Sequence, residues 1–257
     1  MNLKDKLKEA GVENPALEAR WILQDIPDLS AIKEDEIALR RARGEPLSRI
    51  LGAREFYGRR FEVNEFTLDP RPDSETLIEA VLKFSGNKKN ILDMGTGTGC
   101  LLITLLCELK NTEGMGVDLS QEALLVAQKN ATLHSVSNRI KFIHSDWFKN
   151  VTGTYDVILS NPPYIKSEVI PFLDESVKNF DPILSLDGGA SGIEPYKKLL
   201  LGAKNSLAKG GRLFFEIGFD QSGELTRLVE TYGATLIHTH YDLAGHPRVL
   251  EIAYGDK

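Results

Sequence analysis

From residue 89 onward, short apolar runs alternate with segments of helical periodicity, and this alternation restricts the fold more than any other feature. The apolar runs are rich in branched and aromatic residues and are bounded by turn residues, as buried strands are. The predicted strands are 90–93, a run ending at 118, 140–144, 155–160, 212–218, 235–238 and 248–253. The helices expected between them are 100–109, 121–133, 195–207 and 221–232. This alternation predicts a doubly wound α/β sheet.

The composition is that of an ordinary globular protein. The chain has 257 residues, of which 42% are hydrophobic and 26% charged, enough for one large core or two smaller ones. No apolar run is as long as a membrane span, and the N-terminus leads into a charged amphipathic segment, unlike a signal peptide. We therefore expect a cytoplasmic protein that does not bind membranes.

Charge and cysteine content exclude further classes. The net charge of −6 lacks the basic surface of a dedicated duplex-binding protein, so no direct nucleic-acid binding is expected. Seven arginines lie between residues 40 and 60; a solvated face is favoured for them, and a patch for an acidic partner is the alternative. Cys100 and Cys107 share one helical run, about 10 Å apart along its axis, which is too far for a disulfide. No metal-ligand cluster surrounds them, and no metal site is predicted.

The predicted strand 90–93 ends in a glycine-rich loop, 93–99. Three glycines at a strand-to-helix junction allow a ligand to approach the backbone closely. Asp93 places a carboxylate near this loop, which disfavours a pyrophosphate and suits a cation. Asp118 ends the next strand, where an acid binds ribose hydroxyls. A ligand with a ribose, a positive charge and no phosphate is S-adenosylmethionine; the alternative is a tight turn that needs glycines only for packing.

A third strand end is followed by Ser145, Asp146 and Trp147. Asp146 is suited to accept a hydrogen bond from an adenine amino group, and Trp147 to pack on the adenine ring. A core tryptophan beside an aspartate turn remains the alternative on the sequence alone.

The predicted strand 155–160 runs into Asn161-Pro162-Pro163-Tyr164. The prolines end the strand because neither can donate a ladder hydrogen bond, and they make a rigid rim at the ligand-binding end of the sheet. The Asn161 amide oxygen and the Pro162 carbonyl suit the two hydrogens of one planar NH2 group, and Tyr164 suits its face. Two such acceptors favour that nitrogen as positive charge develops on it. The alternative is a strand-ending turn whose tyrosine packs on the surface.

Residues before 70 follow another pattern. Helical spacing continues to about residue 50, with helix starts at Asn14 before proline and at Ser30 or Lys33. The third of these helices carries Ile32, Ile37 and Leu39, and residues 53–68 indicate a hairpin. Residues 73–75 are expected to cap the next helix. The predicted domains are a helical bundle for partner recognition (1–52), a hairpin linker (53–70) and an α/β domain (71–257).

The loop 93–99 together with Asn161-Pro162-Pro163-Tyr164 resembles the HemK-type methyltransferases, which methylate the glutamine side-chain amide of peptide chain release factors. The resemblance covers nearly the whole chain. Other segments similar to motifs of that family are 46–52, 56–58, 70–72, 186–189, 216–218 and 242–245. Ser74 stands where the family usually has threonine, and His246-Pro247 where charged residues are common. Both differences are expected to lie outside the methyl-transfer centre.

The resemblance implies a Rossmann-like class I S-adenosylmethionine-dependent methyltransferase sheet of seven strands, the last one reversed. It also implies methylation of a release factor glutamine in translation termination, and we expect a monomer. The residues expected in catalysis are Asn161, Pro162 and Tyr164. Those expected to bind the cofactor are Asp93, Gly95, Thr96, Gly97, Thr98, Gly99, Asp118, Asp146, Trp147 and Asn161. Those expected to bind the substrate are Asn161, Pro162, Pro163 and Tyr164.

Two other functions share parts of this pattern. An N6-adenine methyltransferase for DNA or RNA uses the same acceptors, because adenine also presents a planar NH2 group, but it would need a basic groove. A cofactor-binding sensor without turnover is the non-enzymatic alternative, and the intact Asn161 motif beside an intact glycine loop speaks against it.

Overall fold

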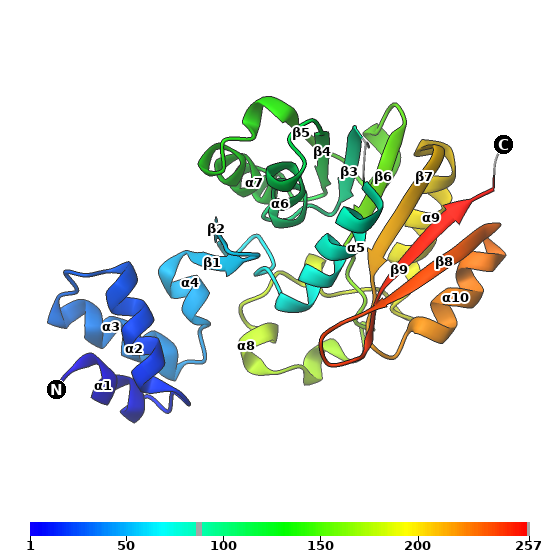
Figure 1. Ribbon diagram of the computed structural model, residues 1–257. Helices are drawn as coiled ribbons and strands as arrows, with labels where there is room; N and C mark the ends of the chain where they lie inside the picture. The colour runs from blue at the N-terminus through cyan, green and yellow to red at the C-terminus, as the bar shows by residue number, and fades with distance from the viewer. Residues whose placement is uncertain (86–88, 256–257) are drawn as a thin grey trace.

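The structure is a computed structural model that describes residues 1–85 and 89–255. A seven-stranded sheet with the order β5-β4-β3-β6-β7-β9-β8 dominates it (Figure 1). Its strands are β3 (Asn90–Met94), β4 (Glu113–Asp118), β5 (Ile140–His144), β6 (Tyr155–Ser160), β7 (Leu207–Glu216), β8 (Ala234–Tyr241) and β9 (Pro247–Tyr254). The pairs among β3, β4, β5, β6 and β7 are parallel, whereas β9 is antiparallel to β7 and β8. The predicted α/β sheet with a reversed last strand is confirmed.

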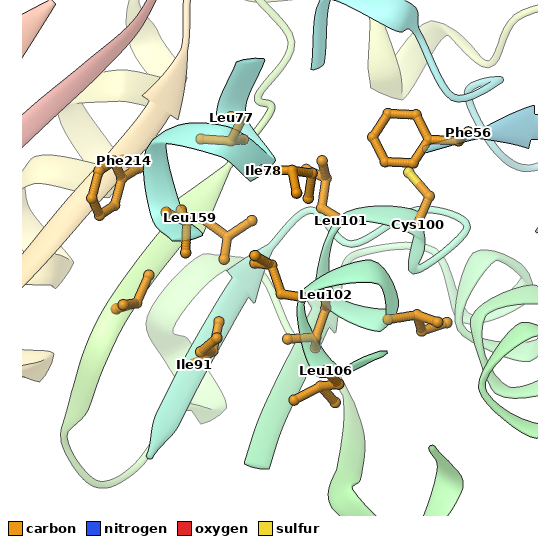
Figure 2. Packing of buried hydrophobic residues seen from close by; sticks show 14 of the residues in the cluster. Phe56, Leu77, Ile78, Ile91, Cys100, Leu101, Leu102, Leu106, Leu159 and Phe214 are labelled. Atoms are coloured by element: carbon orange, nitrogen blue, oxygen red, sulfur yellow. The ribbon is translucent and has the colours of Figure 1, made fainter. Parts of the chain in front are cut away.

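Helices cover both faces of this sheet. They are α5 (Glu75–Ser85), α6 (Cys100–Glu108), α7 (Gln121–Leu133), α9 (Glu194–Ser206) and α10 (Ser222–Thr231). Successive strand residues point to opposite faces, so Ile91 packs in one core and Leu92 in the other. In the first core, Leu102 and Leu106 of α6 lie toward the sheet side chains, which include Ile91 (Figure 2). Burial on both faces explains why residues 157–159 of β6 and 213–215 of β7 are all apolar.

The N-terminal helices are α1 (Leu3–Glu9), α2 (Pro15–Asp25), α3 (Ala31–Ala42) and α4 (Leu47–Leu51). They enclose a core of their own around Leu7 and Ile22. Ser30 caps α3 by accepting from the Lys33 amide, as predicted. Asn14 is the N-cap residue of α2 and Pro15 follows it at the start of the helix, as predicted, although the Asn14 side chain makes no capping hydrogen bond. Of the three apolar residues expected on α3, Ile37 is buried, while Ile32 and Leu39 are exposed.

A hairpin joins these helices to the sheet. Its strands are β1 (Ala53–Phe56) and β2 (Arg59–Glu62), and both turn residues between them have positive φ, as a tight two-residue hairpin requires. Phe56 and Phe61 enter the core on the α6 face of the sheet. Asn130 of α7 also holds the Glu62 backbone by two hydrogen bonds of 2.7 and 3.0 Å. The hairpin is thus packed onto the sheet.

The remaining short helices are η1 (Pro72–Ser74), η2 (Ser137–Arg139), η3 (Trp147–Asn150), η4 (Ile170–Phe172), α8 (Glu175–Lys178) and η5 (Ile183–Ser185). Three differences from the sequence expectations matter. The first turn before α5 is the helix η1, and the Ser74 hydroxyl donates to Glu216 instead of capping α5. β7 begins at Leu207 because Tyr155 pairs with that residue across a register shift. β8 extends to Tyr241 because it pairs with β9 along its length.

No helix within the described ranges is both long and apolar enough to span a membrane. The same residues contain no group of three or more His, Cys, Asp or Glu side chains arranged to hold a metal ion. Cys100 and Cys107 are both free thiols.

Candidate active site

A cavity of about 470 Å³ opens at the carboxyl ends of β3, β4, β5 and β6. Ligands bind at this edge of open α/β sheets because the loops that follow neighbouring parallel strands meet there. Most of the residues predicted from the sequence line it, namely Gly95, Thr96, Gly97, Thr98, Asp118, Asp146, Trp147, Asn161, Pro162 and Pro163. The loops after these four strands therefore bring the predicted cofactor and substrate residues to one place.

The glycine loop bends around the N-terminus of α6. Gly95, Gly97 and Gly99 all have positive φ, between 54° and 79°. A Cβ on Gly99 would lie 2.8 Å from Ile103 Cδ1 and 3.3 Å from Ala127 Cβ, so this glycine allows close helix packing. A Cβ on Gly97 would meet no atom within 4 Å, because this part of the loop borders the cavity. Gly99 thus serves packing, and Gly97 leaves its backbone open to a ligand.

Asp118 anchors the loop from the neighbouring strand. Its Oδ2 accepts from the Gly97 amide at 2.8 Å and its Oδ1 from the Ser120 amide at 2.9 Å. Burial raises the pKa of this carboxyl, while the backbone donors oppose the rise. Each carboxylate oxygen has a further lone pair, so the side chain can accept from ribose hydroxyls while it holds the loop.

Asp93 lies beneath the loop and is not among the residues that line the cavity. It is fully buried, and its Oδ2 accepts a hydrogen bond of 2.7 Å from the Thr96 hydroxyl. Burial raises the pKa of this carboxyl to about 7. Its other oxygen has no hydrogen-bond partner among the residues that the structure describes. Asp93 therefore does not line the cavity itself but is hydrogen-bonded to Thr96, which does.

Asp146 and Trp147 form the far rim of the cavity. Trp147 has a φ of 50°, an uncommon conformation for a large side chain. Lys198 of α9 lies 5.8 Å from the centroid of the Trp147 ring and 3.8 Å from Asp146 Oδ1. No sequence signal marked this lysine, because only the tertiary fold brings α9 to the rim.

A second cavity of about 270 Å³ adjoins the large one, and the chain after β6 lines both of them. Asn161 lines both cavities, Pro162 lines the larger one and Tyr164 the smaller one. Gly188 packs against this turn so closely that a Cβ would lie 2.8 Å from Tyr164 Cα. Hydrogen bonds between Ile165 and the 186–188 backbone hold the two segments together. The turn is therefore rigid, and Tyr164 lies beside Asn161 on the side of the second cavity.

Two side chains behind Asn161, Ser74 and Glu216, form contacts with it that the sequence did not predict. The Asn161 Nδ2 donates to Ser74 Oγ at 3.0 Å, and Ser74 Oγ donates to Glu216 Oε2 at 2.5 Å. The expectation that Ser74 lies outside the methyl-transfer centre is therefore wrong, because the chain before α5 folds back against the end of β6. The motif 216–218 was noted in the sequence, but nothing there connected it to Asn161.

The larger cavity fits S-adenosylmethionine by its chemistry. It offers an open backbone at Gly97, a carboxylate at Asp118 for hydroxyls and an aromatic ring at Trp147 for a base. When ionised, the buried Asp93 carboxyl supplies negative charge beneath the loop, and a cationic ligand would favour that ionised form. These residues would hold the ribose, the adenine and the amino-acid portion of the cofactor.

Comparison with known proteins identifies the family of this chain. Residues 69–179 match the Methyltransferase small domain family. The chain is 38% identical to the release factor glutamine methyltransferase of Agrobacterium fabrum, over 96% of this chain and 93% of that protein. It is 36% identical to the Caulobacter vibrioides protein of the same name, over 96% and 92%.

Among solved structures, the hMettl16 catalytic domain in complex with MAT2A 3'UTR hairpin 6 is similar in fold, with a TM-score of 0.61 and 18% identity over 87% of this chain and 82% of that one. The Rossmann-like methyltransferase fold and S-adenosylmethionine as methyl donor, both expected from the sequence, are confirmed. Identity above one third over almost the full length of both proteins leads to one conclusion: the chain belongs to the release factor glutamine methyltransferase family.

Proposed function

We propose that this protein transfers the methyl group of S-adenosylmethionine to the side-chain amide nitrogen of a glutamine in a peptide chain release factor. The observation that carries this proposal is the position of Asn161, which lines both the cofactor-sized cavity and the smaller cavity beside it. A substrate amide that enters from the smaller side would meet Asn161 before it meets the cofactor.

The residues around Asn161 suit a neutral planar NH2 group. The Asn161 side-chain oxygen and the Pro162 carbonyl would accept one hydrogen each, and the rigid turn fixes the angle between them. S-adenosylmethionine, when bound, supplies a methyl group on a positively charged sulfur. As the new C–N bond forms, positive charge develops on the amide nitrogen, and the two acceptors stabilise that charge.

The site does not need a strong base to begin the reaction. The amide proton becomes acidic only as the C–N bond forms and the methyl–sulfur bond breaks, and it is then lost to water. Asn161 is neutral, so it orients the substrate without abstracting that proton. Burial raises the pKa of Tyr164 above its ordinary value, so this tyrosine remains a neutral phenol beside the substrate. The protein contributes position and hydrogen-bond acceptors, and the cofactor contributes the reactivity.

We also propose a separate role for each of three parts of the chain. Residues 1–52 recognise the release factor, residues 53–70 link them to the sheet, and residues 71–257 form the methyltransferase domain. The separate core of α1, α2 and α3 supports this division. We further propose that the protein acts as a monomer, without direct nucleic-acid contact, in the cytoplasm, where translation terminates.

Labelled S-adenosylmethionine tests the proposal. The purified protein is incubated with a release factor, with its Gln→Ala variant and with a DNA oligonucleotide. Label on the wild-type factor alone is the expected result. Label on the DNA alone would support N6-adenine methylation instead. Retained cofactor binding with no labelled substrate would favour a sensor.

A further inference from the structure

A chain of hydrogen bonds leads from Asn161 into the core of the sheet. Asn161 Nδ2 donates to Ser74 Oγ at 3.0 Å, and Ser74 Oγ donates to Glu216 Oε2 at 2.5 Å. Ser74 and Glu216 are buried, with 3% and 2% of their surface exposed. A hydroxyl–carboxylate hydrogen bond of this length is of the strong, charge-assisted kind.

The direction of this chain follows from what each group can donate. An ionised carboxylate only accepts, and a serine hydroxyl has one proton. Because the Ser74 hydroxyl donates its hydrogen bond to Glu216, the Ser74 oxygen can only accept a hydrogen bond from Asn161. The asparagine must therefore turn its NH2 group toward Ser74, which leaves its carbonyl oxygen for the cavity. The two orientations of an amide are nearly equal in shape, so this hydrogen-bond chain decides between them.

We propose that Ser74 and Glu216 are positioning residues that hold the Asn161 amide with its oxygen toward the substrate nitrogen. This inference rests on the proposed function, because a glutamine NH2 group needs acceptors at that place. With the asparagine reversed, its NH2 group would face the substrate NH2 group, and its oxygen would point toward Ser74. The side chain would then offer no acceptor to the substrate. The methyl-transfer step would then lose one of the two contacts that stabilise the developing charge.

The chain can reverse when Glu216 is protonated. Burial raises the pKa of this carboxyl to about 7, Asp73 adds to the rise, and Ser74, Arg248 and Asn161 oppose it. The other titratable groups that interact with it are Tyr164, Tyr196 and Cys100. A protonated Glu216 donates to Ser74 Oγ. The Ser74 hydroxyl is then free to donate its own proton to the side-chain oxygen of a reversed Asn161 amide. Turnover is therefore expected to fall as the pH falls through about 7.

Kinetics of four variants test the assignment. Ser74→Ala should lower kcat for release factor methylation about 10- to 100-fold, with the Kd for S-adenosylmethionine within about threefold of wild type, since Ser74 acts through Asn161. Ser74→Thr keeps the hydroxyl and should retain kcat within about threefold. Thr104→Ala, which removes another fully buried hydroxyl on α6, is the matched control and should leave kcat unchanged. Glu216→Gln should lower kcat and abolish its decline between neutral and acidic pH.

A kcat within about twofold of wild type in both Ser74→Ala and Glu216→Gln would overturn the proposal. So would a Glu216→Gln enzyme that keeps the wild-type acid limb. Circular dichroism and cofactor binding of each variant show that it is folded before the kinetics are compared.

A second measurement does not depend on the substrate. The side-chain NH2 resonances of Asn161, identified by their loss in Asn161→Asp, are followed by NMR across the same pH range. They should titrate in the wild type and become independent of pH in Glu216→Gln. A wild-type signal that does not titrate would overturn the inference even if the release factor is methylated. If the signal titrates but no release factor is labelled, the proposed function fails and the orienting role of Glu216 stands.

Discussion

The Arg49 guanidinium lies 3.1 Å from the Asp181 carboxylate, although 132 positions separate the two residues in the chain. Arg49 belongs to α4, whereas Asp181 belongs to the connection after β6 whose next residues line the larger cavity. Asp181 also accepts from Arg71 at 2.5 Å, and Arg49 lies 3.2 Å from Asp69. This buried cluster ties the N-terminal helices to one wall of the active site.

Removal of Asp181 should destabilise the protein strongly. Asp181→Ala leaves the buried Arg49 and its neighbour Arg71 with fewer counter-charges, and breaking a buried ion pair typically lowers the free energy of unfolding by about 3 kcal/mol or more. Asp25→Ala, which removes the partner of the exposed Arg60, should lower it by no more than about 1 kcal/mol. Urea denaturation measures both values. Equal effects of the two substitutions would mean that the cluster is no stronger than a surface pair.

Asn161→Ala should abolish most turnover and spare cofactor binding. One of the two proposed acceptors for the substrate NH2 group is lost, which lowers kcat by about 10²- to 10³-fold. The Kd for S-adenosylmethionine, measured by calorimetry, should change far less. Asn179→Ala, an exposed asparagine after α8, serves as the control with wild-type kcat. Full activity of Asn161→Ala would remove this residue from the mechanism.

Asp118 should matter more to cofactor affinity than Asp146. Asp118→Asn weakens the hold on the Gly97 and Ser120 amides and the proposed contact to ribose, so we expect the Kd for S-adenosylmethionine to rise about 10- to 100-fold. The Asp146 side chain is 57% exposed, and its conversion to asparagine should raise the Kd less than about fivefold. Calorimetric titration of the two variants decides the order. The reverse order would place the ribose at the other side of the cavity.

Asp93 should make stability depend on pH in an unusual direction. Burial raises the pKa of Asp93 in the folded protein to about 7 from an ordinary 3.8. The contribution of this carboxyl to the free energy of unfolding is therefore fully present below the unfolded-state pKa, and it is lost as the pH rises through about 7. The free energy of unfolding of wild type relative to Asp93→Asn should therefore fall by roughly 2–4 kcal/mol between about pH 4 and pH 8. Denaturation of both proteins at several pH values measures this difference. A constant difference would show that Asp93 does not titrate abnormally.

Sequence patterns were sufficient for the sheet and for most of the cavity lining because their signals are local. Asp118 ends a predicted strand, and the glycine loop and the Asn161 turn each follow one directly; parallel strands end at one edge of the sheet. Once the strands are recognised, these residues must meet. The positions of β3, β5 and β6 agree with the prediction to within a residue for the same reason.

The features that were missed depend on contacts between distant parts of the chain. Ser74 and Glu216 are 142 positions apart, and neither lies in a pattern whose period or spacing points at the other. Ser74 reads as a helix cap from its neighbours alone, since serine at a helix start usually has that role. The tertiary contact with Glu216 overrides this local preference.

The reversed strand β9 has a consequence for synthesis of the protein. It is the last strand in the chain, yet it lies between β7 and β8 and supplies Arg248, which interacts with Glu216. Until residues 247–254 leave the ribosome, β7 and β8 each present an unpaired edge, a state that invites association with other chains. A nascent chain that ends before β9 would therefore lack both the closed sheet and the charge that faces the active-site carboxylate, so its activity and its solubility would be lost together.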